Sequence, residues 1–150
     1  MLQRTFETPT GAFTVVEKDG ALVQSFWGGD GQDRSDLLLQ AQAQLEAYFA
    51  KELTQFDLPL FVVGSETQRK ICDQISAIPF GETREYGDLS RALNVPAQAI
   101  GQGCGRNPLP ILIPCHRILS ARGLGGFSGD GGVETKVWLL RHEGAAGLLI

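Results

Sequence analysis

The chain has 150 residues, of which 43% are hydrophobic and 20% are charged, and this composition predicts a folded globular protein and excludes a disordered one. Its length allows one domain or two small packed units. No run of about 18 apolar residues could span a bilayer. Residues 1–6 lack a signal-peptide core, so we expect a cytoplasmic protein with no membrane contact.

The net charge of −4, from 13 Lys and Arg against 17 Asp and Glu, is unusual for a nucleic-acid binder, because phosphate contacts supply most of the non-specific affinity. The acids, however, gather early in the chain, at Asp19, Asp30, Asp33, Asp36, Glu46 and Glu52. The bases that could form a positive face all follow residue 65: Arg69, Lys70, Arg84, Arg91, Arg106, Arg117, Arg122, Lys136 and Arg141. We therefore expect any DNA affinity to be modest and salt-sensitive.

Three cysteines, Cys72, Cys104 and Cys115, are an odd number without the spacing of a metal site. This pattern favours reduced thiols in an intracellular compartment. His116 and His142 are the only histidines, so a zinc site would need carboxylates or scattered cysteines. We therefore predict that the protein binds no metal.

Residues 3–28 alternate short apolar runs with turn signals, and Asp19-Gly20 between two β-prone runs is a strong hairpin signal. We predict an antiparallel sheet here. The glycine-rich residues 28–31 resemble a phosphate-binding loop only in composition, since no Walker or dinucleotide spacing is present, and an ordinary loop is favoured. A helix follows from Ser35, with one apolar face made of Leu38, Ala41, Leu45, Tyr48 and Phe49.

Gly64 and Ser65 mark a boundary between two parts of the chain. Ser65 is a typical N-cap for a helix from Glu66 to about Ala77, and Gln68 would complete a capping box. Cys72 lies on this helix, where packing is favoured over chemistry.

Two short helical patterns, residues 86–93 and 96–105, are separated by a tight turn and predict a helix-turn-helix with Pro96 at the first position of the second helix. That second helix carries Gly101, Gly103 and Gly105, which cost about 1 kcal/mol each relative to alanine. A bare helix face serves either close approach to a DNA groove or tight packing against another helix. Periodicity alone does not choose between them.

The end of the chain is expected to form a turn, a loop and a helix. Residues 120–126 predict a hairpin or wing turn, and residues 127–132 a loop. The final helix covers residues 133–142 and is ended by Gly144. Its expected inward side chains are Val133, Val137, Trp138 and Leu140.

Residues 110–118 place a thiol, an imidazole and a guanidinium side by side, at Cys115, His116 and Arg117. Pro114 removes a backbone donor and fixes φ, so the chain should turn just before Cys115. A cysteine is nucleophilic as its thiolate, which a neighbouring base or cation promotes. Adjacent side chains often point apart, so His116 could act on Cys115 only through a bridging water or a turn.

This segment resembles the active-site motif of the O6-alkylguanine-DNA alkyltransferase family, Pro-Cys-His-Arg between Ile or Val residues. Asn107-Pro108-Leu109-Pro110 precedes it as in the family. The resemblance extends to further motifs, which are Ile78-Pro79-Phe80-Gly81-Glu82-Thr83, Tyr86-Gly87-Asp88-Leu89, Gly126-Phe127-Ser128-Gly129 and Lys136-Val137-Trp138-Leu139-Leu140-Arg141-His142-Glu143-Gly144. It covers residues 65–145 well, and residues 1–60 in general pattern.

The resemblance implies an α+β fold. Residues 1–62 would form a ribonuclease H-like structural domain, a small antiparallel sheet plus a helix. It would pack on a helix-turn-helix, winged-helix-like domain of residues 63–150, which binds DNA and accepts the alkyl group. The family acts as a monomer on double-stranded DNA without a cofactor, and its second helix, here 96–105, enters the minor groove. This favours the DNA interpretation of the glycines.

The implied reaction is direct, single-turnover transfer of an alkyl group from O6-alkylguanine, with O4-alkylthymine as a further candidate, to Cys115. His116 would deprotonate the thiol through a water, and Glu143 would orient His116. Asn107 would hold the helix and the active-site segment together.

Because the target atom lies inside the base stack, the guanine must rotate out into a pocket. By resemblance, Tyr86 supplies a hydroxyl near the base, Pro110 and Phe127 form apolar walls, and Ser128 faces O6. The main-chain carbonyls of Cys115 and Ile118 read the exocyclic amine. The DNA-binding face would consist of Gln98, Ala99, Gly101, Gln102 and Arg106.

The sequence departs from the family pattern at Gln98, where an intercalating arginine is usual. Glutamine fills part of the vacated stack but carries no cation, so we expect slower repair in duplex DNA. Two alternatives remain open. One is a non-enzymatic alkyltransferase-like damage sensor, although such proteins have typically lost the cysteine that this chain has at Cys115. The other is a cysteine hydrolase built on Cys115, His116 and Glu143, which would leave the helix-turn-helix unexplained.

Overall fold

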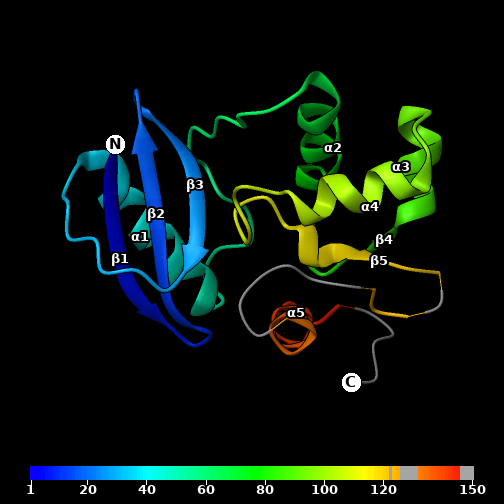
Figure 1. The fold of residues 1–150 in the computed structure, drawn as a ribbon. Coiled ribbons are helices and arrows are strands. Elements are labelled where there is room, and N and C mark those ends of the chain that lie inside the picture. The colour runs from blue at the N-terminus through cyan, green and yellow to red at the C-terminus, as the bar shows by residue number, and fades with distance from the viewer. Residues whose placement is uncertain (122, 126–131, 146–150) are drawn as a thin grey trace. The chain divides into compact units, whose positions relative to one another are not determined.

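The structure is a computed structural model that describes residues 1–121, 123–125 and 132–145. It divides into two compact units, Met1–Val63 and Gly64–Ile150. The first unit contains an antiparallel sheet and a helix, and the second consists mainly of helices (Figure 1). The predicted α+β class is confirmed.

The sheet of the first unit is a meander whose strands pair in the order β1-β2-β3. The strands are antiparallel, and their bounds are β1 (Leu2–Thr8), β2 (Gly11–Lys18) and β3 (Ala21–Trp27). Asp19 and Gly20 connect the last two strands with φ of 53° and 80°. Positive φ at both central residues matches the right-handed twist of paired strands, so the predicted hairpin is confirmed.

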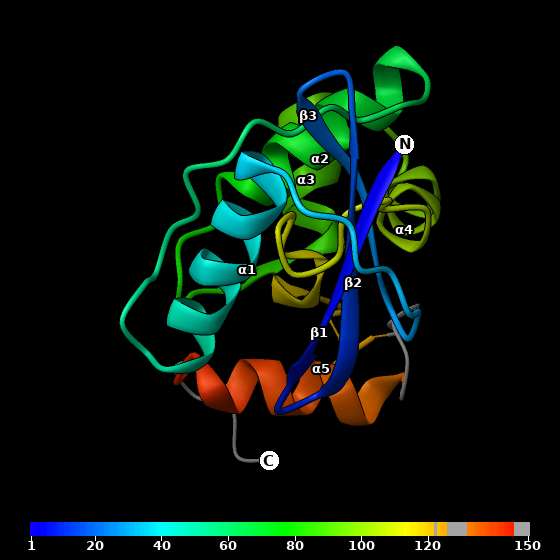
Figure 2. The same ribbon diagram turned by 90° about the vertical axis from the view of Figure 1, so that its left-hand side faces the viewer.

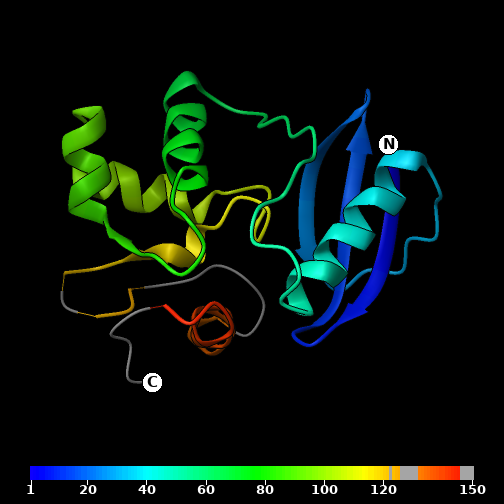
Figure 3. The ribbon, with the colours of Figure 1, turned by 180° about the vertical axis from the view of Figure 1, so that it is seen from behind.

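Helix α1 (Asp36–Phe49) lies across one face of this sheet (Figure 3). It begins where predicted, because the Ser35 hydroxyl accepts a hydrogen bond from the Leu38 amide at 3.0 Å. The predicted apolar face is buried at Leu38, Ala41, Leu45 and Tyr48, while Phe49 is half-buried. With the buried sheet residues Phe13, Val15 and Leu22, these side chains form the core of the unit.

The glycine-rich segment before α1 is a loop that lies tightly against the sheet. The Gly31 amide donates to the Thr5 hydroxyl at 2.9 Å, and the Gly28 amide to the Ala12 carbonyl at 2.8 Å. A Cβ on Gly31 would lie 2.7 Å from the Gln3 carbonyl oxygen, so only glycine fits there. These amides are used within the unit, which supports the loop interpretation over a phosphate cradle.

The second unit contains the predicted helix-turn-helix. Its helices are α2 (Glu66–Ser76), α3 (Tyr86–Leu93), α4 (Ala97–Gly105) and α5 (Val133–His142). Between α3 and α4, Asn94 adopts the left-handed conformation with φ 55°. Pro96 was expected at the first position of α4 but is its N-cap, so the helix begins one residue later, at Ala97. The two-residue strands β4 (Arg84–Glu85) and β5 (Ile118–Leu119) pair in parallel and have too few residues for an alternating pattern.

Helices α2 and α4 are joined by a contact that changes the role expected of Gln68. Ser65 caps α2 as predicted and accepts from the Gln68 amide at 3.1 Å. The Gln68 side chain does not complete the capping box but donates to the Gly103 carbonyl at 2.9 Å. A Cβ at Gly103 would lie 2.5 Å from Ile71 Cδ1, so this glycine serves helix packing.

Helix α5, seen lengthwise in Figure 2, buries Leu140 as predicted but not the other three side chains expected to face inward. Its buried side chains are Lys136, Leu139 and Leu140, whereas Val133 is 44% exposed and Val137 and Trp138 are half-buried. The reason is that positions 136, 139, 140 and 143 share one side of a helix, and the buried Glu143 fixes which side faces inward. Gly144, with φ 63°, follows the helix end as predicted.

The predicted turn after β5 is present where the structure describes it. Ser120 and Gly123 exchange backbone hydrogen bonds of 3.1 and 3.3 Å. Positions 122 and 126 of this turn, and the predicted loop up to residue 131, lie outside the described residues. None of the helices in the described part of the chain is long and apolar enough to cross a bilayer.

Candidate active site

Cys115 opens a single turn of 3₁₀-helix, η1 (Cys115–Arg117), directly after a sharp bend. The Cys115 amide donates to the Ile113 carbonyl at 2.8 Å around Pro114, and the Arg117 amide donates to the Pro114 carbonyl at 2.9 Å. The predicted turn at Pro114 is confirmed. Cys115 is only 6% exposed, so a substrate must reach its sulfur inside the protein.

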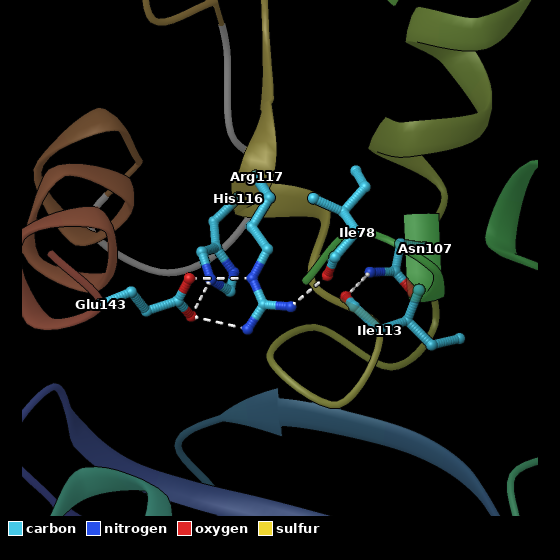
Figure 4. Close-up of polar contacts among 6 residues, drawn as sticks. All are labelled: Ile78, Asn107, Ile113, His116, Arg117 and Glu143. Carbon is cyan, nitrogen blue, oxygen red and sulfur yellow. Dashed lines mark hydrogen bonds and ion pairs between the residues drawn. The ribbon is translucent and has the colours of Figure 1, made fainter. Parts of the chain in front are cut away.

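Asn107 braces the loop that leads to Cys115. Its Nδ2 donates to the Ile113 carbonyl at 2.8 Å (Figure 4). Its Oδ1 accepts from the Leu109 amide at 3.0 Å. The loop contains Ile111 at φ 71°, a conformation that a β-branched residue rarely adopts and that costs about 1–3 kcal/mol. Ile111 is buried, so its apolar contacts and the Asn107 hydrogen bonds together hold the strained backbone.

His116 is completely buried, and its Nε2 lies 2.6 Å from Oε2 of Glu143 (Figure 4). The structure thus brings together two residues that the resemblance paired. The other ring nitrogen, Nδ1, is also buried and has no hydrogen-bond partner among the residues that the structure describes. A buried nitrogen of this kind is normally satisfied by a water or a ligand.

Arg117 is the second partner of Glu143. Its Nε donates to Oε1 at 2.8 Å and its Nη2 to Oε2 at 3.0 Å, the bidentate geometry that arginine forms with carboxylates. Its Nη1 donates to the Ile78 carbonyl at 2.6 Å, and the guanidinium lies 5.9 Å from the Phe80 ring centroid. Arg117 is therefore the buried ion-pair partner of Glu143 and does not add to an exposed positive face.

These contacts determine the protonation of the pair. Burial alone would raise the pKa of Glu143, but hydrogen bonds from His116 and Arg117, together with the charge of Arg117, lower it to about 2. Burial lowers the pKa of His116 below its ordinary value, although Glu143 opposes this change. Glu143 is therefore ionised and His116 neutral at pH 7. Since a carboxylate only accepts hydrogen bonds, Nε2 carries the proton and Nδ1 presents its lone pair.

The thiol of Cys115 is protonated at rest. Burial raises its pKa, while a hydrogen bond from Asn107 and the charge of Lys136 act in the opposite direction. Burial also raises the pKa of Cys72 to about 11 and that of Cys104 to about 12. Each thiol therefore needs a base to become nucleophilic, and His116 is the base next to Cys115 in sequence.

Lys136 is a site residue that sequence reasoning missed. It is completely buried on α5, and its Nζ donates to the Ile118 carbonyl at 2.6 Å. Burial lowers its pKa to about 8. The available signal was its spacing of seven residues from Glu143, which places both side chains on one face of α5.

The predicted base pocket is described in part. Tyr86 begins α3 and is half-buried, and burial raises its pKa with smaller contributions from Cys104 and Cys115. A Cβ on Gly125 would lie 3.3 Å from the Tyr86 hydroxyl oxygen. Pro110 is half-buried and Ile118 fully buried. The remaining predicted pocket residues, Phe127 and Ser128, lie outside the described residues.

The predicted DNA-binding residues share the outward face of α4. Gln98, Gln102 and Arg106 are exposed, and Ala99 and Gly101 are half-buried. The opposite face is buried and consists of Ile100, Gly103 and Cys104. In the described ranges, no group of three or more His, Cys, Asp or Glu side chains is placed to hold a metal ion.

The glycines of α4 divide between the two interpretations left open by the sequence. Gly103 packs against Ile71, as described above. A Cβ at Gly101 or Gly105 would instead meet nothing within 4 Å, so packing inside the protein does not require either glycine. For these two glycines the DNA interpretation stays a prediction.

The chain is similar to known proteins along nearly its whole length. Residues 1–62 match the ribonuclease-like domain of 6-O-methylguanine DNA methyltransferase, and residues 66–145 match its DNA binding domain. The methylated-DNA–protein-cysteine methyltransferase of Methanosarcina acetivorans is 34% identical, over 97% of this chain and 99% of the relative. That of Mycobacterium tuberculosis is 43% identical, over 93% and 90%.

Solved structures show the same similarity along nearly the whole chain. The crystal structure of Mycobacterium tuberculosis OGT in complex with DNA has a TM-score of 0.86 and 34% identity, and covers 97% of this chain and 94% of that one. The O6-methylguanine DNA methyltransferase of Methanococcus jannaschii has a TM-score of 0.67 and 25% identity, over 98% and 96%. The fold, the buried cysteine site and both domain matches lead to one conclusion: the chain belongs to the 6-O-methylguanine DNA methyltransferase family.

Proposed function

We propose that this protein repairs double-stranded DNA by moving the alkyl group of O6-alkylguanine to the sulfur of Cys115, once per molecule. The observation that carries the proposal is the buried His116–Glu143 pair directly after the buried Cys115, in which the lone pair of His116 Nδ1 has no partner in the described part of the chain. Family membership and the DNA complex of a similar structure support the same function.

The chemistry follows from the protonation of the site. A water bound at His116 Nδ1 passes the thiol proton of Cys115 to the imidazole, and the ionised Glu143 stabilises the imidazolium that forms. The thiolate attacks the alkyl carbon, a carbon–sulfur bond forms and the carbon–O6 bond breaks. The electron pair of the broken bond stays on guanine, which takes up one proton. The thioether has no route back to a thiol, so each molecule acts once.

The guanine reaches Cys115 by leaving the helix. We propose that α4 enters the minor groove and that the base turns out into a pocket formed by Tyr86, Pro110 and Ile118, with Phe127 and Ser128. The Ile118 carbonyl already accepts from Lys136 and has a second lone pair for the exocyclic amine of guanine. Lys136 thereby holds a recognition group in place.

Several further assignments belong to this proposal. Residues 1–62 serve as a structural domain, and residues 63–150 bind DNA and accept the alkyl group. The protein acts as a monomer in the cytoplasm and needs no cofactor, because the thiolate itself is the acceptor. Gel filtration tests the monomeric state, and cell fractionation tests the cytoplasmic location.

The direct test is to incubate the protein with a duplex that carries one O6-methylguanine, and then to measure its intact mass and map its peptides. We expect one methyl group on the Cys115 peptide and none on those of Cys72 and Cys104, whose pKa values are raised to about 11 and 12. Cys115→Ala should remain unmodified. Tight binding of the lesion without a mass change would refute alkyl transfer and would identify a damage sensor.

A further inference from the structure

The outward face of α4 carries polar side chains and glycines that have no part in the alkyl-transfer step itself. Gln98, Gln102 and Arg106 are exposed and follow one another at intervals of one helical turn. Gly101 and Gly105 lie beside them, and a Cβ at either would meet nothing within 4 Å. The face therefore combines a row of polar side chains with a strip of bare backbone.

The bare strip brings the amide of Gln102 within reach of base edges. Gly101 and Gly105 lie on either side of Gln102, one residue before it and three after it, so the helix backbone can approach the floor of a groove there. In the part of the chain that the structure describes, the Gln102 side chain makes no hydrogen bond to another residue. Its amide is therefore available to a partner.

An amide has a chemical property that suits the minor groove. Glutamine donates from Nε2 and accepts at Oε1, whereas arginine and lysine only donate. In the minor groove, A·T pairs present acceptors alone, and a G·C pair adds the N2 amine of guanine as a donor. The Gln102 amide can accept from this amine and donate to the adjacent N3 of the same base.

We propose that Gln102 reads the minor-groove edge of a guanine next to the lesion, so that the rate of repair depends on the flanking base pair. This inference rests on the proposed function, because it requires α4 to enter the minor groove of the damaged duplex. Gln98 lies one turn earlier, at the position that we assign to the space left by the extruded base. The two amides thus have separate roles.

The test uses duplexes that contain one O6-methylguanine and differ in a single neighbouring pair. G·C is compared with inosine·C, which lacks the N2 amine, and A·T with 2,6-diaminopurine·T, which adds it. The pair is varied on each side of the lesion and in both orientations, and single-turnover methyl transfer is measured below saturation. We expect about fivefold faster transfer with the amine at one position. Because the amine also strengthens the base pair, an effect of duplex melting would have the opposite sign.

Gln102→Leu removes the amide at similar size and should abolish the preference for the amine. Gln98→Leu is the matched control, which should react more slowly overall but keep the preference. Both positions are exposed, so circular dichroism should show an intact fold, and Gln102→Ala provides a second variant. Equal wild-type rates on G·C and inosine·C at every position, or a preference that survives Gln102→Leu, would overturn the inference. Absence of methyl transfer with every duplex would refute the proposed function instead.

Discussion

Replacing Glu143 by glutamine tests the central ion pair, because it removes the charge and keeps the shape. The carboxylate accepts from His116 Nε2 at 2.6 Å and from Arg117 Nε and Nη2 at 2.8 and 3.0 Å. An amide has one oxygen and one NH₂ group, so one of its positions must face a donor of Arg117. The variant therefore leaves a buried, permanently charged guanidinium incompletely paired.

Two estimates of the loss agree. Breaking a buried ion pair costs about 3–5 kcal/mol, and the hydrogen bonds that remain in the variant place it at the lower end. Independently, the pKa of Glu143 falls from its ordinary 4.5 to about 2 on folding. At about 1.4 kcal/mol for each pKa unit, this corresponds to about 3 kcal/mol. We expect Glu143→Gln to lose about 3 kcal/mol of unfolding free energy at pH 7.

The lowered pKa of Glu143 also determines how the stability of the protein depends on pH. Since the folded pKa is lower than the unfolded one, the unfolded state binds more protons between these values, and stability rises with pH across this range. The contribution of Glu143 is fully present above the unfolded value of 4.5 and is lost as the pH falls through about 2. Glu143→Gln should therefore lack this part of the acid sensitivity of the wild type.

Denaturant unfolding followed by circular dichroism at pH 7, and again at several acidic pH values, measures both effects. Glu134→Gln is the matched control, because it makes the same chemical change at an exposed position of the same helix. It should stay within about 0.5 kcal/mol of the wild type. If Glu143→Gln were as stable as this control, the assignment of the ion pair as a major contact of the fold would be wrong.

Three further substitutions test other parts of the structure. Asn107→Ala removes the hydrogen bonds that brace the strained loop and should cost about 2 kcal/mol by denaturant unfolding, and an unchanged midpoint would contradict the bracing role. Gln98→Arg should speed single-turnover repair in duplex DNA, and equal rates for the two proteins would contradict the proposed weakness of extrusion. Gly101→Ala should raise the unfolding free energy by up to about 1 kcal/mol while weakening DNA binding. Gly103→Ala, whose Cβ would meet Ile71 at 2.5 Å, should instead lower the stability, and the opposite order of these two variants would contradict the division of the glycines.

Local signals predicted local structure. The Asp19-Gly20 hairpin, the start of a helix at Ser35, the Ser65 cap and the turn at Pro114 each depend on residues close together in the sequence, and all are present. The resemblance also predicted the pairing of His116 with Glu143, which is 27 residues later in the chain.

Contacts between residues far apart in the sequence were harder to predict. Nothing near Arg117 in sequence indicates that its guanidinium reaches both Glu143 and the Ile78 carbonyl, 39 residues earlier. Lys136 was missed because a lysine is assigned to the outside by default, and only the ion pair of Glu143 reveals which face of α5 is inside. The Gln68 side chain was predicted to bond within its own helix turn. It instead donates to the Gly103 carbonyl, which is 35 residues away in the sequence.

The contacts of Glu143 have a consequence for reading related sequences. One carboxylate holds both the imidazole proposed for chemistry and the guanidinium that ties the chain together. A descendant that lost Cys115 would give up the proposed reaction but would still be stabilised by the ion pair of Arg117 and Glu143. Retention of these two residues therefore reports that a chain can fold as this one does. The proposed alkyl transfer additionally requires the thiol at position 115 and the imidazole of His116.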